Sequence, residues 1–116
     1  MFLKREWTPL FLSDWTESPH ATGEETGETV FQILSKMLNK GNYVKVVFDD
    51  IERIDRDFAI AAFCHLYEDF HPVYLRKHLS FHNLDRATVN FLKKNIRLFS
   101  KGYRFYYIMK TISLAE

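Results

Sequence analysis

One stretch of the sequence constrains the fold more than any other. Residues 43–48, Tyr-Val-Lys-Val-Val-Phe, are β-branched, aromatic and almost entirely apolar, which is typical of a central strand covered on both faces. A helix is predicted before this strand, over about Gly27–Asn39 with Thr26 as its N-cap, because apolar residues recur there on one helical face. These apolar positions are Val30, Ile33, Leu34, Met37 and Leu38.

The same alternation of strand and helix continues after residue 48. A second helix is predicted to begin near Asp55 or Asp57 and to run to about Phe70, where His71-Pro72 ends it. A short strand follows at Leu79–His82. Asp85 is the expected N-cap of a third helix, which reaches about Phe99, and the last predicted strand is Tyr103–Met109.

With a weaker strand at Trp7–Leu12, the order becomes β-α-β-α-β-α-β. Strands separated by helices are joined by crossovers, which make neighbouring strands parallel. The predicted fold class is therefore α/β: a mainly parallel sheet of four strands, or five, with about three helices packed against it. We expect one domain over residues 1–116, with a polar, acidic loop at 10–25 and a tail at 111–116.

Composition agrees with a single globular domain, since 47% of the 116 residues are hydrophobic and 27% are charged. The only cysteine, Cys64, lies in the apolar run 58–64, which predicts a buried thiol and excludes an internal disulfide. No apolar stretch approaches the roughly 18 residues that span a bilayer, and residues 1–7 do not resemble a signal peptide. We therefore expect a cytoplasmic protein.

The net charge of +1 indicates neither a nucleic-acid nor a membrane partner. The charge is unevenly distributed, however. Residues 1–58 carry 7 Lys/Arg and 11 Asp/Glu, whereas residues 59–116 carry 9 and 4. This asymmetry is compatible with a polar protein-binding face, and equally with two solvated faces that bind nothing.

Four segments follow one another in a recognisable order. A Gly precedes the amphipathic helix 27–39, the strand 43–48 ends in Asp49-Asp50-Ile51-Glu52-Arg53-Ile54, the second helix opens with Asp55-Arg56-Asp57-Phe58-Ala59, and the later strand runs into Asn83-Leu84. Over about residues 26–99 the chain resembles the STAS-like family of unknown function, relatives of the bacterial anti-sigma factor antagonists.

This resemblance implies a regulatory domain that binds a protein partner, such as a kinase of the GHKL ATPase type or another signalling protein. In the antagonists, that kinase phosphorylates a Ser at the start of the central helix. Asp57 stands at the matching position here. Its carboxylate carries one negative charge, where a phosphoserine would carry about −1.5 to −2. Asp57 is thus either a fixed charge at an interaction surface or simply a favourable residue at a helix start.

The expected partner-binding surface is the turn and start of the second helix, with the beginning of the third helix nearby. We assign to it Asp50, Asp55, Arg56, Asp57, Phe58 and Asn83. The aspartates would supply charge complementarity, and Arg56 could pair with a partner carboxylate. We predict no catalytic residues, no metal ligands and no cofactor. The sequence leaves the oligomeric state open.

Two alternatives from other functional classes remain. A cluster of Asp49, Asp50, Asp55 and Asp57 could hold Mg²⁺ in a small phosphate-handling enzyme. A nucleic-acid-binding module could instead use the basic third helix, where the cations are Lys93, Lys94 and Arg97, with Lys101 and Arg104 nearby. The five histidines and the single cysteine complete no metal-ligand pattern.

Overall fold

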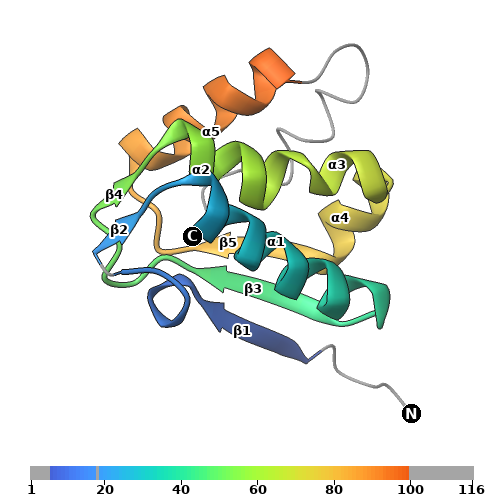
Figure 1. Cartoon of the computed structure of the whole chain (residues 1–116). Coiled ribbons are helices and arrows are strands. Elements are labelled where there is room, and N and C mark those ends of the chain that lie inside the picture. The colour runs from blue at the N-terminus through green and yellow to red at the C-terminus, as the bar shows by residue number, and fades with distance from the viewer. Residues whose placement is uncertain (1–5, 18, 100–116) are drawn as a thin grey trace.

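The computed structural model describes residues 6–17 and 19–99 of the chain. Within these residues, three parallel strands form the main sheet in the order β1 (Trp7–Phe11), β3 (Tyr43–Val47) and β5 (Leu79–His82) (Figure 1). The predicted central strand is confirmed, because β3 pairs with β1 on one side and with β5 on the other. The predicted strand 103–109 and the tail 111–116 lie outside the described residues.

Helices connect these strands and confirm the α/β class. Between β1 and β3 lies α1 (Glu24–Asn39), and after β5 comes α5 (Arg86–Phe99). The second crossover, between β3 and β5, contains several short helical segments where one helix reaching about Phe70 was predicted. It holds α2 (Arg56–Ala59), a π-helical turn η2 (Ile60–Cys64), α3 (Leu66–Asp69) and α4 (Pro72–His78).

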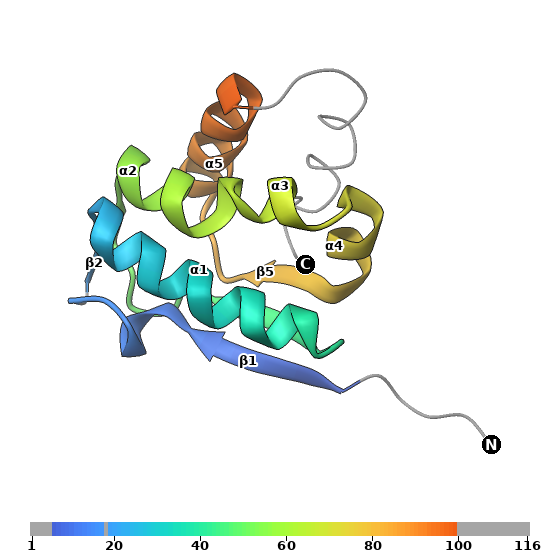
Figure 2. The ribbon, with the colours of Figure 1, turned by 45° about the vertical axis from the view of Figure 1, so that its right-hand side comes forward.

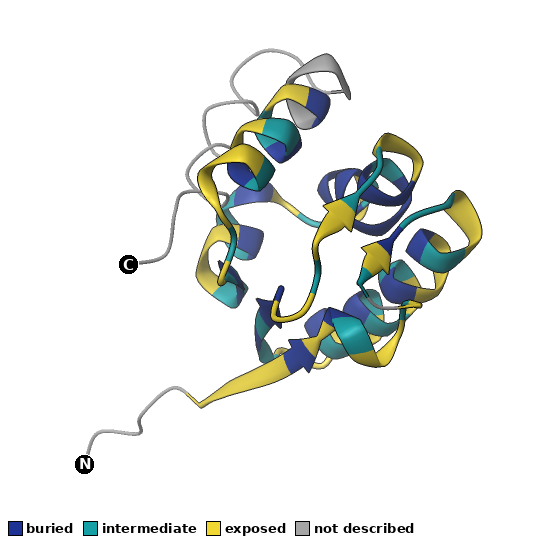
Figure 3. Ribbon diagram, turned by 90° about the vertical axis from the view of Figure 1, so that its left-hand side faces the viewer, coloured by how far each residue is buried: buried dark blue, intermediate teal, exposed yellow. Residues whose placement is uncertain are grey.

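The two faces of the main sheet differ. Leu10, Val46 and Phe81 lie beside one another across the three strands, and all are buried. Figures 1 and 2 both place α1 and the α2–α3 segment on the same side of this sheet. Strand β1 forms one edge of this sheet. Its residue Leu10 is buried, whereas Trp7 and Phe11, whose side chains point to the opposite face, are exposed. Accordingly, β1 is largely exposed in Figure 3.

The first helix begins earlier than predicted. Its first residue is Glu24 and its N-cap is Gly23, at φ 90°, rather than Thr26. Thr26 therefore lies within the first turn. Part of the segment predicted as a loop is also ordered into secondary structure: Leu12–Asp14 form a 3₁₀ turn, η1, and β2 covers His20–Ala21.

A second small sheet lies beside the start of α2. It consists of β2 and β4 (Arg53–Ile54), which pair in parallel, with His20 opposite Arg53 and Ala21 opposite Ile54. The ladder is extended by the backbone bond from the Asp55 N–H to the Ala21 carbonyl at 3.2 Å. The segments that precede α1 and α2 are thereby held side by side. No helix in the described part of the chain is long and apolar enough to cross a membrane.

Candidate functional site

Asp55 connects the starts of two helices. Its backbone is extended, at φ −105° and ψ 171°, and its carboxylate accepts a hydrogen bond from the Phe58 N–H at 2.9 Å, as an N-cap residue does. The same carboxylate accepts from the Gly23 N–H, 3.1 Å from both oxygens. Asp55 is therefore the N-cap of α2 and also binds the residue that precedes α1. Of the two helix starts that the sequence allowed, Asp55 or Asp57, the structure selects Asp55.

The place where Asp55 joins the start of α1 to the start of α2 is called the junction here, and a close contact between α1 and the α2–η2 segment reinforces it. Gly27, in the first turns of α1, packs directly on the next helical segment. A Cβ atom at position 27 would lie 2.8 Å from the Cβ of Ala61 and 2.8 Å from the carbonyl oxygen of Phe58. Real Cβ atoms do not approach so closely, so only glycine fits there with the present spacing. The junction holds the first turn of α1 directly against α2 and η2.

The predicted site residues on this segment divide into exposed and buried groups. Arg56 and Asp57 are exposed, so both face water at the start of α2. Phe58 is fully buried, and its ring meets that of Phe63 edge to face at 5.9 Å between centroids. The assignment of Phe58 to a partner-contacting surface therefore needs correction. Each residue of a helix is rotated about the axis from the one before it. This rotation turns the Phe58 side chain away from the water-facing side that Arg56 and Asp57 occupy and into the core.

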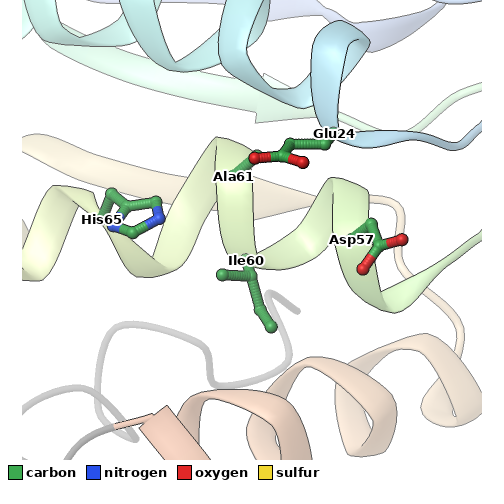
Figure 4. Close-up of a pocket in the computed structure, with 5 residues that line it drawn as sticks. All are labelled: Glu24, Asp57, Ile60, Ala61 and His65. Carbon is green, nitrogen blue, oxygen red and sulfur yellow. The ribbon is translucent and has the colours of Figure 1, made fainter.

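A half-open pocket of about 170 Å³ lies along the outer side of this junction. Its lining residues are Glu24, Asp57, Ile60, Ala61 and His65. Figure 4 shows Glu24 reaching from the start of α1 over Ala61, with Asp57 towards one end of the helical segment and His65 towards the other. Of these five residues, only Asp57 belonged to the predicted site.

Two further predicted residues lie where the strands of the main sheet end. Asp50 follows β3 and Asn83 follows β5, and both are exposed and adopt left-handed backbone conformations, at φ 63° and 62°. The Asn83 amide donates a hydrogen bond to the Asp49 carboxylate. Asp and Asn tolerate this conformation better than most residues, which gives both positions a structural explanation.

The four aspartates do not form the metal cluster of the magnesium alternative. Among the described residues, no three His, Cys, Asp or Glu side chains come together in a way that would hold a metal ion. The thiol of Cys64 is buried as predicted, and this burial raises its pKa to about 12. It is therefore protonated near neutral pH and is not poised as a nucleophile.

The basic third helix corresponds to α5, and it carries two of the lysines of the nucleic-acid alternative. Val89 and Leu92 of α5 are buried, whereas Lys94 is exposed and Lys93 is half-buried. Asp85 caps this helix as predicted, since its carboxylate accepts from the Thr88 N–H at 2.7 Å. That hydrogen bond lowers the pKa of Asp85. Lys101 and Arg104 lie outside the described residues, so the nucleic-acid alternative stays a hypothesis.

Comparing the chain with models of protein families, with curated proteins and with solved structures gives no match. The start of α2 is the part of the described chain whose geometry suits a binding role. That geometry is a rigid junction with a charged, water-facing edge and a small pocket beside it.

Proposed function

We propose that this chain is a non-enzymatic, STAS-like regulatory module that binds a protein partner through the start of α2. The observation that carries the proposal is the double role of the Asp55 carboxylate, which receives the N–H groups of Phe58 and Gly23. An interaction surface works best when its side chains are held on a preorganised backbone, because less conformational entropy is lost on binding. Asp55 supplies that preorganisation.

Within this proposal, the two exposed residues that follow Asp55 make the contacts. Asp57 presents a carboxylate, and Arg56 presents a guanidinium that can pair with a partner carboxylate through two parallel hydrogen bonds. Opposite charges next to each other at the edge of an interface favour one orientation of the partner over others. Phe58 contributes indirectly, by anchoring the helix in the core.

The sequence resemblance suggests the class of partner, a kinase of the GHKL type or another signalling protein. Asp57 stands where the antagonists carry a phosphorylatable Ser. A carboxylate there supplies negative charge without any covalent modification. We therefore propose a module whose charge at this position is fixed instead of being switched by phosphorylation.

Charge reversal at the two exposed residues tests the proposal. The tagged chain would be purified from its native host as the wild type, as Asp57→Lys and as Arg56→Glu, and the bound proteins quantified by mass spectrometry. Asp69→Lys is the matched control, because Asp69 is exposed at the end of α3. We expect the same specific protein to be depleted at least tenfold in both site variants and retained in the control.

The control for folding is circular dichroism, since all three positions are exposed and the variants should keep the wild-type helix content. Identical sets of bound proteins in the wild type and in both site variants would contradict the proposal. Loss of a bound protein in the Asp69→Lys variant as well would also contradict it, because binding would then depend on overall charge and not on the start of α2.

A further inference from the structure

From the pocket beside the start of α2, we infer that this surface receives one arginine side chain of the partner, with the guanidinium between Glu24 and Asp57 and the aliphatic stem along Ile60 and Ala61. This inference rests on the proposed function, and it adds the chemistry by which the partner is recognised.

The size of the pocket selects a side chain rather than a small molecule. Its volume is about 170 Å³, whereas pockets that bury most of a drug-sized ligand measure roughly 300–1,000 Å³. A single long side chain inserted from a protein surface needs much less space than a nucleotide or a cofactor. The pocket is also half open, which suits a group that enters from a neighbouring macromolecule.

The lining is amphipathic in a way that matches arginine. Glu24 and Asp57 are exposed carboxylates on two different helices, and in the described residues neither has a hydrogen-bond or ion-pair partner. The same pocket is lined by Ala61, which is buried, and by Ile60, which is partly buried. Arginine combines an apolar stem, which packs on aliphatic surface, with a positively charged head that remains hydrated at the rim.

The guanidinium suits this rim better than other cations do. It carries five N–H donors in a plane, so that it can bond to two carboxylates that approach from different directions. A lysine ammonium is compact and strongly hydrated, and pairs with them as a point charge. A divalent metal ion needs several oxygen ligands at short distance, and the described residues assemble no set of three acidic or histidine ligands.

The two walls are fixed relative to each other. Glu24 directly follows Gly23, whose N–H is bound by the Asp55 carboxylate, and Asp57 lies two residues after Asp55. The direct packing of Gly27 on Ala61 and Phe58 prevents the helices from moving closer. Figure 4 shows the resulting position of Glu24 above the helical segment that carries Asp57. The helix starts that carry the two carboxylates are therefore held at a fixed spacing.

At the end opposite Asp57, the pocket is closed by a paired side chain. His65 lies there, with its Nδ1 atom paired to a carboxylate oxygen of Glu68. Its ring also meets that of Phe31 edge to face at 6.3 Å. The Glu68 carboxylate at this end already has His65 as its partner, whereas no partner of Asp57 is found among the described residues, so we place the cationic group of the occupant beside Asp57.

A titration with capped amino acids tests the inference without knowledge of the partner. N-acetyl-arginine methylamide would be added to the ¹⁵N-labelled protein and followed by NMR. Capped citrulline is the matched probe, because it has nearly the shape of arginine but no charge, and capped lysine tests the requirement for a planar head. We expect saturable shifts at the amides of Asp57, Ala61 and His65 with arginine, and smaller shifts with the other two.

Variants then locate the binding site. Glu24→Gln and Asp57→Asn keep the size of each side chain and remove its charge, and each should weaken arginine binding about twofold to fivefold, as exposed ion pairs do. Glu25→Gln is the control, because Glu25 is exposed in the same turn of α1 but does not line the pocket. Binding by Glu25→Gln should equal that of the wild type.

Several results would overturn the inference: no shift at the pocket, equal shifts with citrulline or lysine, or equal weakening by Glu25→Gln. These results are separable from failure of the proposed function. If charge reversal at Asp57 and Arg56 releases the partner while capped arginine does not bind the pocket, the interaction surface stands and its arginine specificity is wrong. If charge reversal releases nothing, the interaction surface itself is wrong.

Discussion

At the scale of single residues, Asp55 and Asp57 illustrate how neighbouring carboxylates take different roles. Asp55 directs its oxygens inward, to the N–H groups of Gly23 and Phe58, while Asp57 lies in the first turn of α2 and is exposed. Aspartate is favourable at either of these positions in a helix start, so the sequence could not decide between them. The extended backbone at Asp55 decides, because only the residue before the first helical turn can direct its side chain back to that turn.

Replacing Asp55 should therefore cost much more stability than replacing Asp57. Loss of an N-cap typically costs about 0.5–2 kcal/mol, and Asp55→Ala also leaves the Gly23 N–H without its partner, which adds about 1 kcal/mol or more. Asp57→Ala removes only a favourable interaction with the helix dipole, about 0.3–1 kcal/mol. Urea unfolding followed by circular dichroism measures both values, and equal losses in the two variants would contradict this assignment.

At the scale of secondary-structure elements, segments with a strong local pattern were predicted correctly. Strand β3, strand β5, helix α5 with its cap Asp85, and most of α1 all lie where apolar periodicity placed them. Helix α4 was missed because Pro72 was interpreted only as the end of the preceding helix. Proline is also favoured in the first turn of a new helix, and here it begins α4, with the His71 side chain accepting from the Val73 N–H.

The elements that build the candidate site were harder to predict because they depend on contacts between distant segments. Strands β2 and β4 have two residues each and exist only as each other's partners. The π-helical turn Ile60–Cys64 has no distinct sequence pattern. The exposure of Arg56 and Asp57 can be predicted from the pattern of polar and apolar residues along one helix. The position of Glu24 over Ala61 cannot, because the two residues belong to different helical segments. Gly27 was the only local signal for it.

The contact at Gly27 leads to a prediction opposite to the usual rule for helices. Gly→Ala inside a helix normally stabilises by about 1 kcal/mol. At position 27 the new methyl group would meet Ala61 and the Phe58 carbonyl at 2.8 Å, and such overpacking costs about 1–3 kcal/mol. Gly27→Ala should therefore lower the free energy of unfolding, measured by urea titration.

Two variants check the cause of that loss. Because Ala61→Gly itself costs stability, a double-mutant cycle is needed: the loss caused by Gly27→Ala should be smaller in the Ala61→Gly background than in the wild type, since one of the two close contacts disappears while the Phe58 carbonyl remains. Glu28→Ala, at an exposed neighbouring position of α1, should change stability by less than about 0.5 kcal/mol. A stabilising effect of Gly27→Ala would show that α1 and η2 are not packed as described.

At the scale of the whole molecule, a group of phenylalanines joins the helices to the sheet. Phe63 of η2 contacts Phe81 of β5 edge to face at 5.2 Å, and it also meets Phe58 and Phe48 at 5.9 and 6.1 Å between ring centroids. All four rings are buried. Cys64 follows Phe63 directly and is buried in the same core, so its thiol reports on the integrity of the entire core.

The thiol should consequently be inert until the protein unfolds. Burial raises its pKa from 9.0 to about 12, so at pH 8 only about one thiol in ten thousand is ionised. We expect labelling by 5,5′-dithiobis(2-nitrobenzoic acid) to be at least a thousandfold slower in the native protein than in 6 M guanidinium chloride. Stability linked to this group should be lost as the pH rises from about 9 towards 12, because the unfolded chain releases the proton first. Rapid stoichiometric labelling under native conditions would contradict the buried position.

The pairing of the strands also has a consequence for how the chain is made. Each strand of the described sheets finds a parallel partner far away in sequence: Trp7 lies opposite Tyr43, His20 opposite Arg53 and Val44 opposite Leu79. None of these pairs can form as a local hairpin. During synthesis, the middle strand cannot acquire both neighbours until residue 82 has left the ribosome, so shorter nascent chains carry an open strand edge that is prone to mispairing.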